Sequence, residues 1–516
     1  MDSTPGPIIP DQDIADESIV ATPDRRRLII HGLAWNSAFQ VFVAAVNFIS
    51  MLVLVRIIPP AEYGRAAAAL GVLGLLNCFN CGFFIAQAIQ LGERDHPDWD
   101  MHWRVGLRIQ FAIAVLCNII AGCLWFSDSY RPIAPLLHLA SLGLLVEAPY
   151  QLSWTMLRRE MDFRRMRFIS AAAVVTSAVV SIGFGMNGFG AAAMILGSNV
   201  CNGLPFGIHL LFLRRWRPKG HWFTAPEWSN YRPALRFGAQ SSGTAMLAAL
   251  RALLESVVLP RTIGYQGMGL LNRAQVLFST TVGRVAWLVM DTVYPLLPRS
   301  AHDPAQFARH ATLVAQTMLL FSIPGAAFLL IEGPTLSRLL YGAKWIAADP
   351  LIAPGTILAW GISTALVFGS ILLAANRLNV SLAVSVTGAC LTLPAMTVAL
   401  LGNGMLMYVW TLAAGQCVAA GIAMVMCTPL LDRWWIRQSL FPPTVAGMIG
   451  ALVLVATTPQ RESFRPAVRL AISAFVFALV MLLVMRAGFA GSLRTVVACL
   501  PGSEHWLRWL KLSAAT

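Results

Sequence analysis

The stretch from Ile29 to Val55 reads IIHGLAWNSAFQVFVAAVNFISMLVLV, and its 27 residues include no Asp, Glu, Lys or Arg. An α-helix rises about 1.5 Å per residue, so this stretch is longer than the roughly 30 Å apolar core of a bilayer. Three arginines, Arg25, Arg26 and Arg27, precede it. The sequence therefore predicts that the chain enters a membrane as a helix close to its start.

The composition extends this prediction to the whole chain. Of the 516 residues, 57% belong to the set AVILMFWYC and only 12% are charged, and the mean hydropathy is +0.66. Soluble domains carry about 25% charged residues, so a water-exposed globular surface is excluded. The nine cysteines lie in apolar stretches, which excludes a secreted disulfide framework. We expect no cofactor, no metal and no nucleic acid as a partner.

Apolar segments of membrane length continue, with short loops between them, to residue 486. We predict fourteen spans, at about 29–55, 66–91, 105–126, 133–157, 168–186, 188–213, 234–258, 266–290, 310–332, 350–374, 379–401, 404–428, 444–458 and 466–486. Pro149, Pro205, Pro324 and Pro394 lie inside spans and predict kinks or broken helices that line a cavity. The expected fold class is an all-α polytopic membrane protein.

The distribution of Lys and Arg predicts the orientation. With a cytoplasmic N-terminus, 25 of the 38 cations fall in cytoplasmic loops and tails, nine on the opposite side and four inside spans. This excess favours an even number of spans with both termini in the cytoplasm. Residues 1–24 are acidic and Pro-rich, which predicts a disordered tail. Ser492 to Leu512 mixes Trp with Arg and Lys, which is typical of an amphipathic helix lying on the membrane surface.

A weak internal repeat predicts two lobes. The end of the first span, LVLVRII at 52–58, is echoed 205 residues later by VVLPRTI at 257–263. Transporters are often built from such repeated halves, with the substrate between them. We expect an N-lobe at 25–213, a cytoplasmic linker at 214–233, a C-lobe at 234–428, two further helices in 429–486 and a cytoplasmic tail at 487–516.

Charged residues inside spans mark the candidate site, because a charge at bilayer depth is costly unless it faces a cavity or a partner. They are Arg236, Arg251 and Glu255 in the seventh span, Arg273, Arg284 and Asp291 in the eighth, and Glu147 in the fourth. The spacing of 11 and 7 places the three charges of the eighth span on one helical face, with Arg251 level with Arg273 across the hairpin. We expect this face to border a water-filled cavity.

Four arginines against three carboxylates favour an anionic substrate. A guanidinium binds pyrophosphate oxygens in pairs and stays charged when it is desolvated. Structural interpretations remain open for several of these residues. Arg251 and Glu255 are spaced to neutralise each other, and Arg236 and Asp291 are close enough to the membrane surface to reach water. Glu147, Glu255 and Asp291 are interpreted as coupling or pairing acids.

Three motifs carry a resemblance to a known family. The segments Gly32–Trp35 and Val55–Gly64 (VRIIPPAEYG), the block LRREMDFRR at 157–165 and RFG at 236–238 resemble Wzx-type polysaccharide flippases of the MOP superfamily. The resemblance implies two six-helix lobes of MOP/MATE-like architecture plus two C-terminal helices. It also implies transport, across the bacterial inner membrane, of undecaprenyl-pyrophosphate-linked oligosaccharide for exopolysaccharide or lipopolysaccharide synthesis. Polymerase and chain-length regulator proteins are the partners it suggests.

Three other functions are weighed against this one. A lipid II flippase of the same superfamily shares a cationic cavity, and a cation-coupled drug exporter of that superfamily calls for an acidic one. An integral-membrane glycosyltransferase or polymerase needs a long outer loop to carry its chemistry. The longest loop here has about 20 residues and is predicted to be cytoplasmic, so we expect a transporter and not an enzyme.

Overall fold

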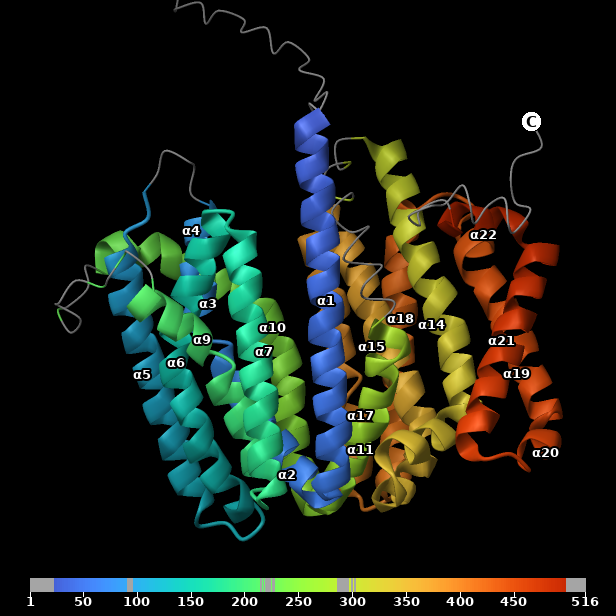
Figure 1. The fold of residues 1–516 in the computed structure, drawn as a ribbon, viewed down its shortest axis with the longest axis horizontal. Coiled ribbons are helices and arrows are strands. Elements are labelled where there is room, and N and C mark those ends of the chain that lie inside the picture. Colours follow the sequence, from blue (N-terminus) through green and yellow to red (C-terminus); the bar gives the residue numbers. More distant parts are fainter. Residues whose placement is uncertain are drawn as a thin grey trace, which may run out of the picture.

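The computed structural model describes residues 23–90, 96–213, 216, 218, 224, 228–284, 297, 300 and 303–497. Within these residues all of the regular secondary structure is helical. Most of the helices run roughly parallel or antiparallel to one another (Figure 1). The all-α polytopic fold class is therefore confirmed.

The first half of the chain contains both long helices and short broken ones. In order they are α1 (Pro23–Ile57), α2 (Pro60–Asn77), α3 (Cys81–Ile85), α4 (Gln87–Gln90), α5 (Trp99–Leu124), η1 (Arg131–Ile133), α6 (Ala134–Arg159), α7 (Phe163–Met186), α8 (Ala191–Ile195), η2 (Leu196–Cys201), α9 (Leu204–Ile208) and η3 (His209–Leu213).

The second half continues the bundle in the same manner. Its helices are α10 (Trp228–Thr262), α11 (Gly264–Thr280), α14 (Pro304–Tyr341), η4 (Ala343–Ala348), α15 (Asp349–Ala374), α16 (Leu378–Cys390), α17 (Leu393–Leu400), α18 (Met405–Cys427), η5 (Thr428–Leu430), η6 (Ile436–Leu440), α19 (Phe441–Ala456), α20 (Thr458–Arg461), α21 (Pro466–Gly488) and α22 (Ala490–Val497).

The structure gives a lower count of spans than the sequence predicted. Among the described residues, twelve helices are long and apolar enough to cross a membrane, and they correspond to twelve of the fourteen predicted spans. The seventh prediction falls on α10 and the first part of the eighth on α11, which are helical but are not among the twelve, and residues 285–290 of the eighth lie outside the described residues. The described part of α11 has 17 residues, or about 26 Å of helix, which is shorter than the bilayer core. The count of fourteen is thus not confirmed.

The predicted effect of proline is confirmed in two spans. The sixth span is broken into α8, two π-helical segments and α9, with Pro205 in the first turn of α9. The eleventh is broken between α16 and α17, just before Pro394. Pro149 and Pro324, by contrast, lie inside the continuous helices α6 and α14.

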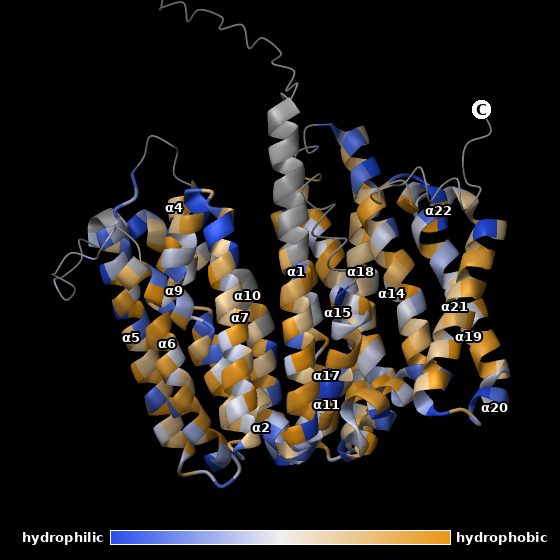
Figure 2. Ribbon diagram, in the orientation of Figure 1, coloured by the Kyte–Doolittle hydropathy of each residue, from blue (hydrophilic) through white to orange (hydrophobic). Residues whose placement is uncertain are grey.

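The outer surface of the bundle is apolar. Figure 2 shows orange, hydrophobic ribbon along most of the length of α5, α19 and α21, with blue residues gathered near the helix ends. Phe475, Leu479 and Leu483 of α21 follow one another at intervals of four residues and are 69%, 44% and 56% exposed. Side chains spaced in this way share one helical face. Such a face is suited to contact with lipid.

Both ends of the described chain lie at the same end of the bundle. In the orientation of Figure 1, α1 begins at the upper end and α22 lies there too, whereas α20 lies at the lower end. The start of the predicted surface helix packs against the bundle. Leu493, Val496 and Val497 of α22 are buried and pack with Leu320 and Met485. The rest of that prediction, residues 498–512, lies outside the described residues.

Candidate functional site: the lower end of the bundle

The two echoed sequences both contact the opposite half of the chain. Arg56, at the end of α1, donates to the carbonyl oxygens of Leu339 and Leu340 at 3.0 and 3.3 Å. Arg261, at the end of α10, lies over the ring of Tyr130, with 4.8 Å from Cζ to the ring centroid. The repeat therefore places equivalent arginines in contacts that cross between the two halves.

Further hydrogen bonds join the two halves at the lower end. The indole N–H of Trp345 donates to the carbonyl of Val55 at 2.9 Å. The Tyr130 hydroxyl donates to the carbonyl of Val257 at 2.5 Å, and the Tyr265 hydroxyl to that of Ser129 at 2.6 Å. Each of these bonds joins an aromatic side chain to a main-chain carbonyl. These three contacts between the two halves are therefore hydrogen bonds and not ion pairs.

Glycines let α2 and α11 approach until their backbones touch. A Cβ atom on Gly64 would lie 1.7 Å from the carbonyl oxygen of Tyr265, and one on Gly269 would lie 1.9 Å from that of Pro60. Any larger residue would push the helices apart. This close contact places the next turn of α11, which carries Arg273, directly against the start of α2.

Arg273 is buried in this contact. Its side chain lies over the ring of Tyr63 at 4.4 Å and donates to the Asn272 side-chain oxygen at 2.7 Å from Nη2. Tyr63 in turn packs edge-on against Trp345, and Trp345 against Tyr341. Arg273 is only 8% exposed. In this conformation the guanidinium is therefore enclosed by aromatic side chains and does not open to a water-filled space.

Arg273 has no acidic partner within the part of the chain that the structure describes. The ion pairs found there involve Arg65, Arg165, Arg251, Arg338, Arg461 and Arg469. A buried charge that is not neutralised by a carboxylate is costly, and a cation–π contact offsets only part of that cost. Among the described residues, the Arg273 guanidinium is thus bound by neutral groups.

The predicted acids lie elsewhere. Glu255 binds Arg251 on the same helix at 3.2 Å, which confirms the pairing predicted from their spacing. Glu147 accepts hydrogen bonds from Asn80 at 2.7 Å and Gln151 at 2.6 Å, all within the first half of the chain. Asp291 lies outside the described residues. Among the predicted charges that the structure describes, these two acids are thus bound by Arg251 and by Asn80 and Gln151, and not by Arg273.

The prediction that Arg273 and Arg284 share one helical face assumed a continuous helix, and that assumption is wrong. Helix α11 ends at Thr280, and Thr281 has φ −101° and ψ −90°, which are not helical angles. Because the helix is interrupted between Arg273 and Arg284, their spacing no longer fixes a shared face. Arg273 is buried, whereas Arg284 and Arg236 are exposed.

One buried charge cluster was not predicted. Glu332 near the end of α14 is fully buried and pairs with Arg461 of α20 and, at 3.1 Å, with Arg469 of α21. Ser473 donates to the same carboxylate at 2.9 Å. Both arginines are among the nine cations predicted to lie on the side opposite the cytoplasm, and the sequence gives them no partner; Arg461 is 3% exposed. Its partner Glu332 lies 129 residues away in the sequence, and no local sequence pattern predicts such a pair.

Comparisons with solved structures define the class. The structure is similar to that titled "Lipid II flippase MurJ, inward closed conformation", with a TM-score of 0.70, 12% identity and coverage of 87% of this chain and 98% of that one. It is also similar to an inward-facing multidrug resistance MATE family transporter of the MOP superfamily, with a TM-score of 0.56, 16% identity and coverage of 74% and 93%. The fold is that of the MOP superfamily of membrane transporters.

The family follows from the sequence. The family described as "Polysaccharide biosynthesis protein" matches residues 53–350, so the chain belongs to it. The chain is 25% identical to lipopolysaccharide biosynthesis protein WzxC of Escherichia coli (strain K12), over 72% of this chain and 75% of that protein. It is 23% identical to succinoglycan biosynthesis transport protein ExoT of Rhizobium meliloti (strain 1021), over 63% and 65%. The resemblance to Wzx-type flippases is confirmed.

Proposed function

We propose that the chain moves undecaprenyl-pyrophosphate-linked oligosaccharide repeat units across the bacterial inner membrane by alternating access. Two lobes, 25–213 and 234–428, would rock about the contacts at the lower end, with the upper end in the cytoplasm. The observation that carries the proposal is Arg273, a buried guanidinium between α2, α11 and α14 that is bound to neutral groups. A pyrophosphate that joins a lipid to a sugar carries two negative charges, and such a guanidinium can bind it in a bidentate manner.

The mechanism assigns different parts to the arginines. Arg236 and Arg284 are exposed, so they would attract the pyrophosphate from the cytoplasmic side. Arg251 is already neutralised by Glu255, so it would contribute less binding free energy. Arg273 would bind the pyrophosphate when Tyr63 moves away with α2. The lower contacts would then have to break before the sugar leaves on the outer side.

A binding measurement tests the substrate assignment directly. Purified full-length protein should bind undecaprenyl pyrophosphate more tightly than uncharged undecaprenol. Arg273→Ala should reduce that preference by about 2–5 kcal/mol, by analogy with truncated charge pairs at interfaces. Arg131→Ala is the matched control, because Arg131 also lies over an aromatic ring, that of Trp125 at 5.6 Å, but is exposed. An unchanged preference in Arg273→Ala would contradict the proposal.

A cellular measurement distinguishes this function from its alternatives. Deletion should cause complete repeat units to accumulate on undecaprenyl pyrophosphate. A lipid II flippase would instead accumulate lipid II, and a glycosyltransferase would leave truncated units. Arg273→Ala and Arg284→Ala should be assayed for polymer export and for membrane protein level together, since lost export at a normal level identifies a transport defect.

The orientation is tested separately. Reporter fusions at Asp162 and Arg217 should report cytoplasm, and fusions at Asn187 and Asn403 should report periplasm, because cationic loops remain inside. A periplasmic signal at Asp162 would invert the direction of transport proposed here.

A further inference from the structure

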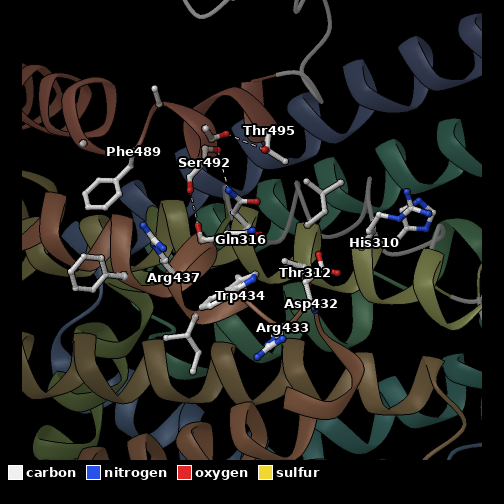
Figure 3. A pocket seen from close by; sticks show the side chains of 18 of the residues that line it. His310, Thr312, Gln316, Asp432, Arg433, Trp434, Arg437, Phe489, Ser492 and Thr495 are labelled. Atoms are coloured by element: carbon white, nitrogen blue, oxygen red, sulfur yellow. Dashed lines mark hydrogen bonds between the residues drawn. The ribbon is translucent and has the colours of Figure 1, made fainter. Parts of the chain in front are cut away.

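A second cationic site lies at the upper end, away from Arg273. A cavity of about 1400 Å³ opens between the start of α14, the π-helix η6 and the connection from α21 to α22 (Figure 3). It is lined by three arginines, Arg309, Arg433 and Arg437, and by one carboxylate, Asp432. Among the described lining residues the arginines exceed the carboxylate by two charges, which suits an anion. None of these residues belongs to the site proposed for transport.

The walls of this cavity are fixed by hydrogen bonds between elements distant in sequence. The Gln316 amide of α14 donates to the carbonyl of Ser492 at 3.0 Å, and the Ser492 hydroxyl donates to the carbonyl of Gln438 at 3.0 Å. The amide of Asp432 donates to the Thr312 hydroxyl at 2.9 Å. Arg437 lies in the π-helical turn, a rare element that is often found at functional sites. The segments that carry the three arginines are therefore held in place by hydrogen bonds to one another.

The same cavity has an apolar, aromatic side. Phe441 and Phe489 both line the cavity and pack edge to face, with 5.8 Å between their ring centroids. Trp434 is 58% exposed and Phe441 is 54% exposed. In Figure 3 the Arg437 side chain points toward Phe489. Exposed aromatic rings beside arginines are typical of the headgroup level of a membrane.

An apolar path leads from the cavity toward the membrane interior. Helix α19 begins at Phe441, and its residues Met448, Leu452 and Val455 are 55%, 68% and 58% exposed. A soluble phosphate compound would gain nothing from this surface, whereas acyl chains would lie along it. We propose that the cavity binds the phosphate headgroup of an anionic phospholipid, with its acyl chains against α19. Basic pockets between membrane helices on the cytoplasmic side bind such headgroups.

The test is a titration of detergent-purified full-length protein with dioleoyl phosphatidylglycerol, dioleoyl phosphatidylcholine and glycerol phosphate. Wild type should prefer phosphatidylglycerol over phosphatidylcholine. The double variant R433Q/R437Q should bind phosphatidylglycerol roughly 30-fold more weakly, which corresponds to about 1 kcal/mol for each cation removed. The single variant Arg437→Gln provides the same test, with a smaller shift, should the double variant fold poorly.

A matched control removes two exposed arginines that lie outside the cavity. R164Q/R377Q changes the net charge by the same amount and should bind phosphatidylglycerol as wild type does. Equal weakening in both double variants would overturn the proposal, since the binding would then follow overall charge. Competition by glycerol phosphate at concentrations similar to the lipid would also overturn it, in favour of a soluble ligand. Neither result bears on undecaprenyl pyrophosphate binding by Arg273.

Discussion

Two arginines of this protein are almost equally buried and yet differ in what surrounds them. Arg461 is 3% exposed and binds the Glu332 carboxylate, Ser473 and the carbonyl of Leu454. Arg273 is 8% exposed, lies over the ring of Tyr63 and donates to the side-chain oxygen of Asn272. The comparison teaches that burial alone does not identify a substrate-binding cation. The charge of Arg461 is neutralised by a carboxylate of the protein. Arg273 contacts neutral side chains among the described residues, and we propose that its charge is neutralised by a bound anion.

The largest effect is expected from removing the acid of the first cluster. Glu332→Ala leaves Arg461 and Arg469 facing each other without a carboxylate, and breaking a buried pair in this way costs about 3–5 kcal/mol. We expect a lower free energy of unfolding and less folded protein in the membrane. Chemical unfolding in detergent measures the first and fluorescence-detected size exclusion the second. Wild-type stability in this variant would remove the distinction between the two arginines.

Lysine substitutions sharpen the comparison. In Arg461→Lys a single nitrogen cannot reach both Glu332 and Leu454, so unfolding should become easier by about 1.5–3 kcal/mol, the range for one charged hydrogen bond. Arg273→Lys keeps the charge but loses the planar fork. It should therefore leave stability near that of wild type and give partial polymer export. A stability loss as large in Arg273→Lys as in Arg461→Lys would show that both arginines are structural.

The ring over Arg273 gives a smaller effect. Tyr63→Phe keeps the aromatic face and should change stability little. Tyr63→Leu removes the face and should cost about 0.5–2 kcal/mol more than Tyr63→Phe, the range for a cation–π contact. Thermal unfolding of the two variants beside Arg273→Ala, alone and combined, measures the coupling. If Tyr63→Leu is equally harmful when Arg273 is already alanine, the ring stabilises the fold through Trp345 instead.

The smallest effect should come from an exposed pair. Arg165 lies 3.2 Å from Asp162, and its side chain is 74% exposed. Such a pair contributes about 0–1 kcal/mol. Arg165→Ala therefore serves as the baseline for the unfolding measurements, and a cost above that range would show that the assay reports loss of charge and not loss of a buried contact.

Sequence patterns predicted those features of the fold that depend on residues close together in the chain. The apolar segments, the breaks near Pro205 and Pro394 and the Arg251–Glu255 pair all depend on residues close together in sequence, and the structure confirms them. The pair formed by Glu332 and Arg461 depends on a contact between distant helices. The common face of Arg273 and Arg284 was lost because α11 is interrupted at Thr281, in the run STTVG at 279–283, whose β-branched residues and glycine favour a helix only weakly.

The partners of Arg273 were also beyond a local analysis. Tyr63 belongs to the motif VRIIPPAEYG that resembles the Wzx-type flippases, but nothing in that motif predicts a contact with Arg273. Its ring meets Arg273 only because Gly64 and Gly269 let α2 and α11 touch. Two glycines 205 residues apart, the same offset as the echoed ends of the first and seventh spans, were the available signal.

The contacts of α14 have a mechanical consequence. The helix is fastened to the C-terminal helices twice, by Gln316 to Ser492 near the upper end and by Glu332 to Arg461 and Arg469 near the lower end. The two fastenings stand 16 residues, or about 24 Å, apart along one helix. Because α14 is bound to the C-terminal helices at two separated points, it cannot rotate freely relative to them. We therefore expect α19 to α22 to move together with α14 as one rigid body. When α14 tilts, these C-terminal helices should be displaced through the surrounding lipid.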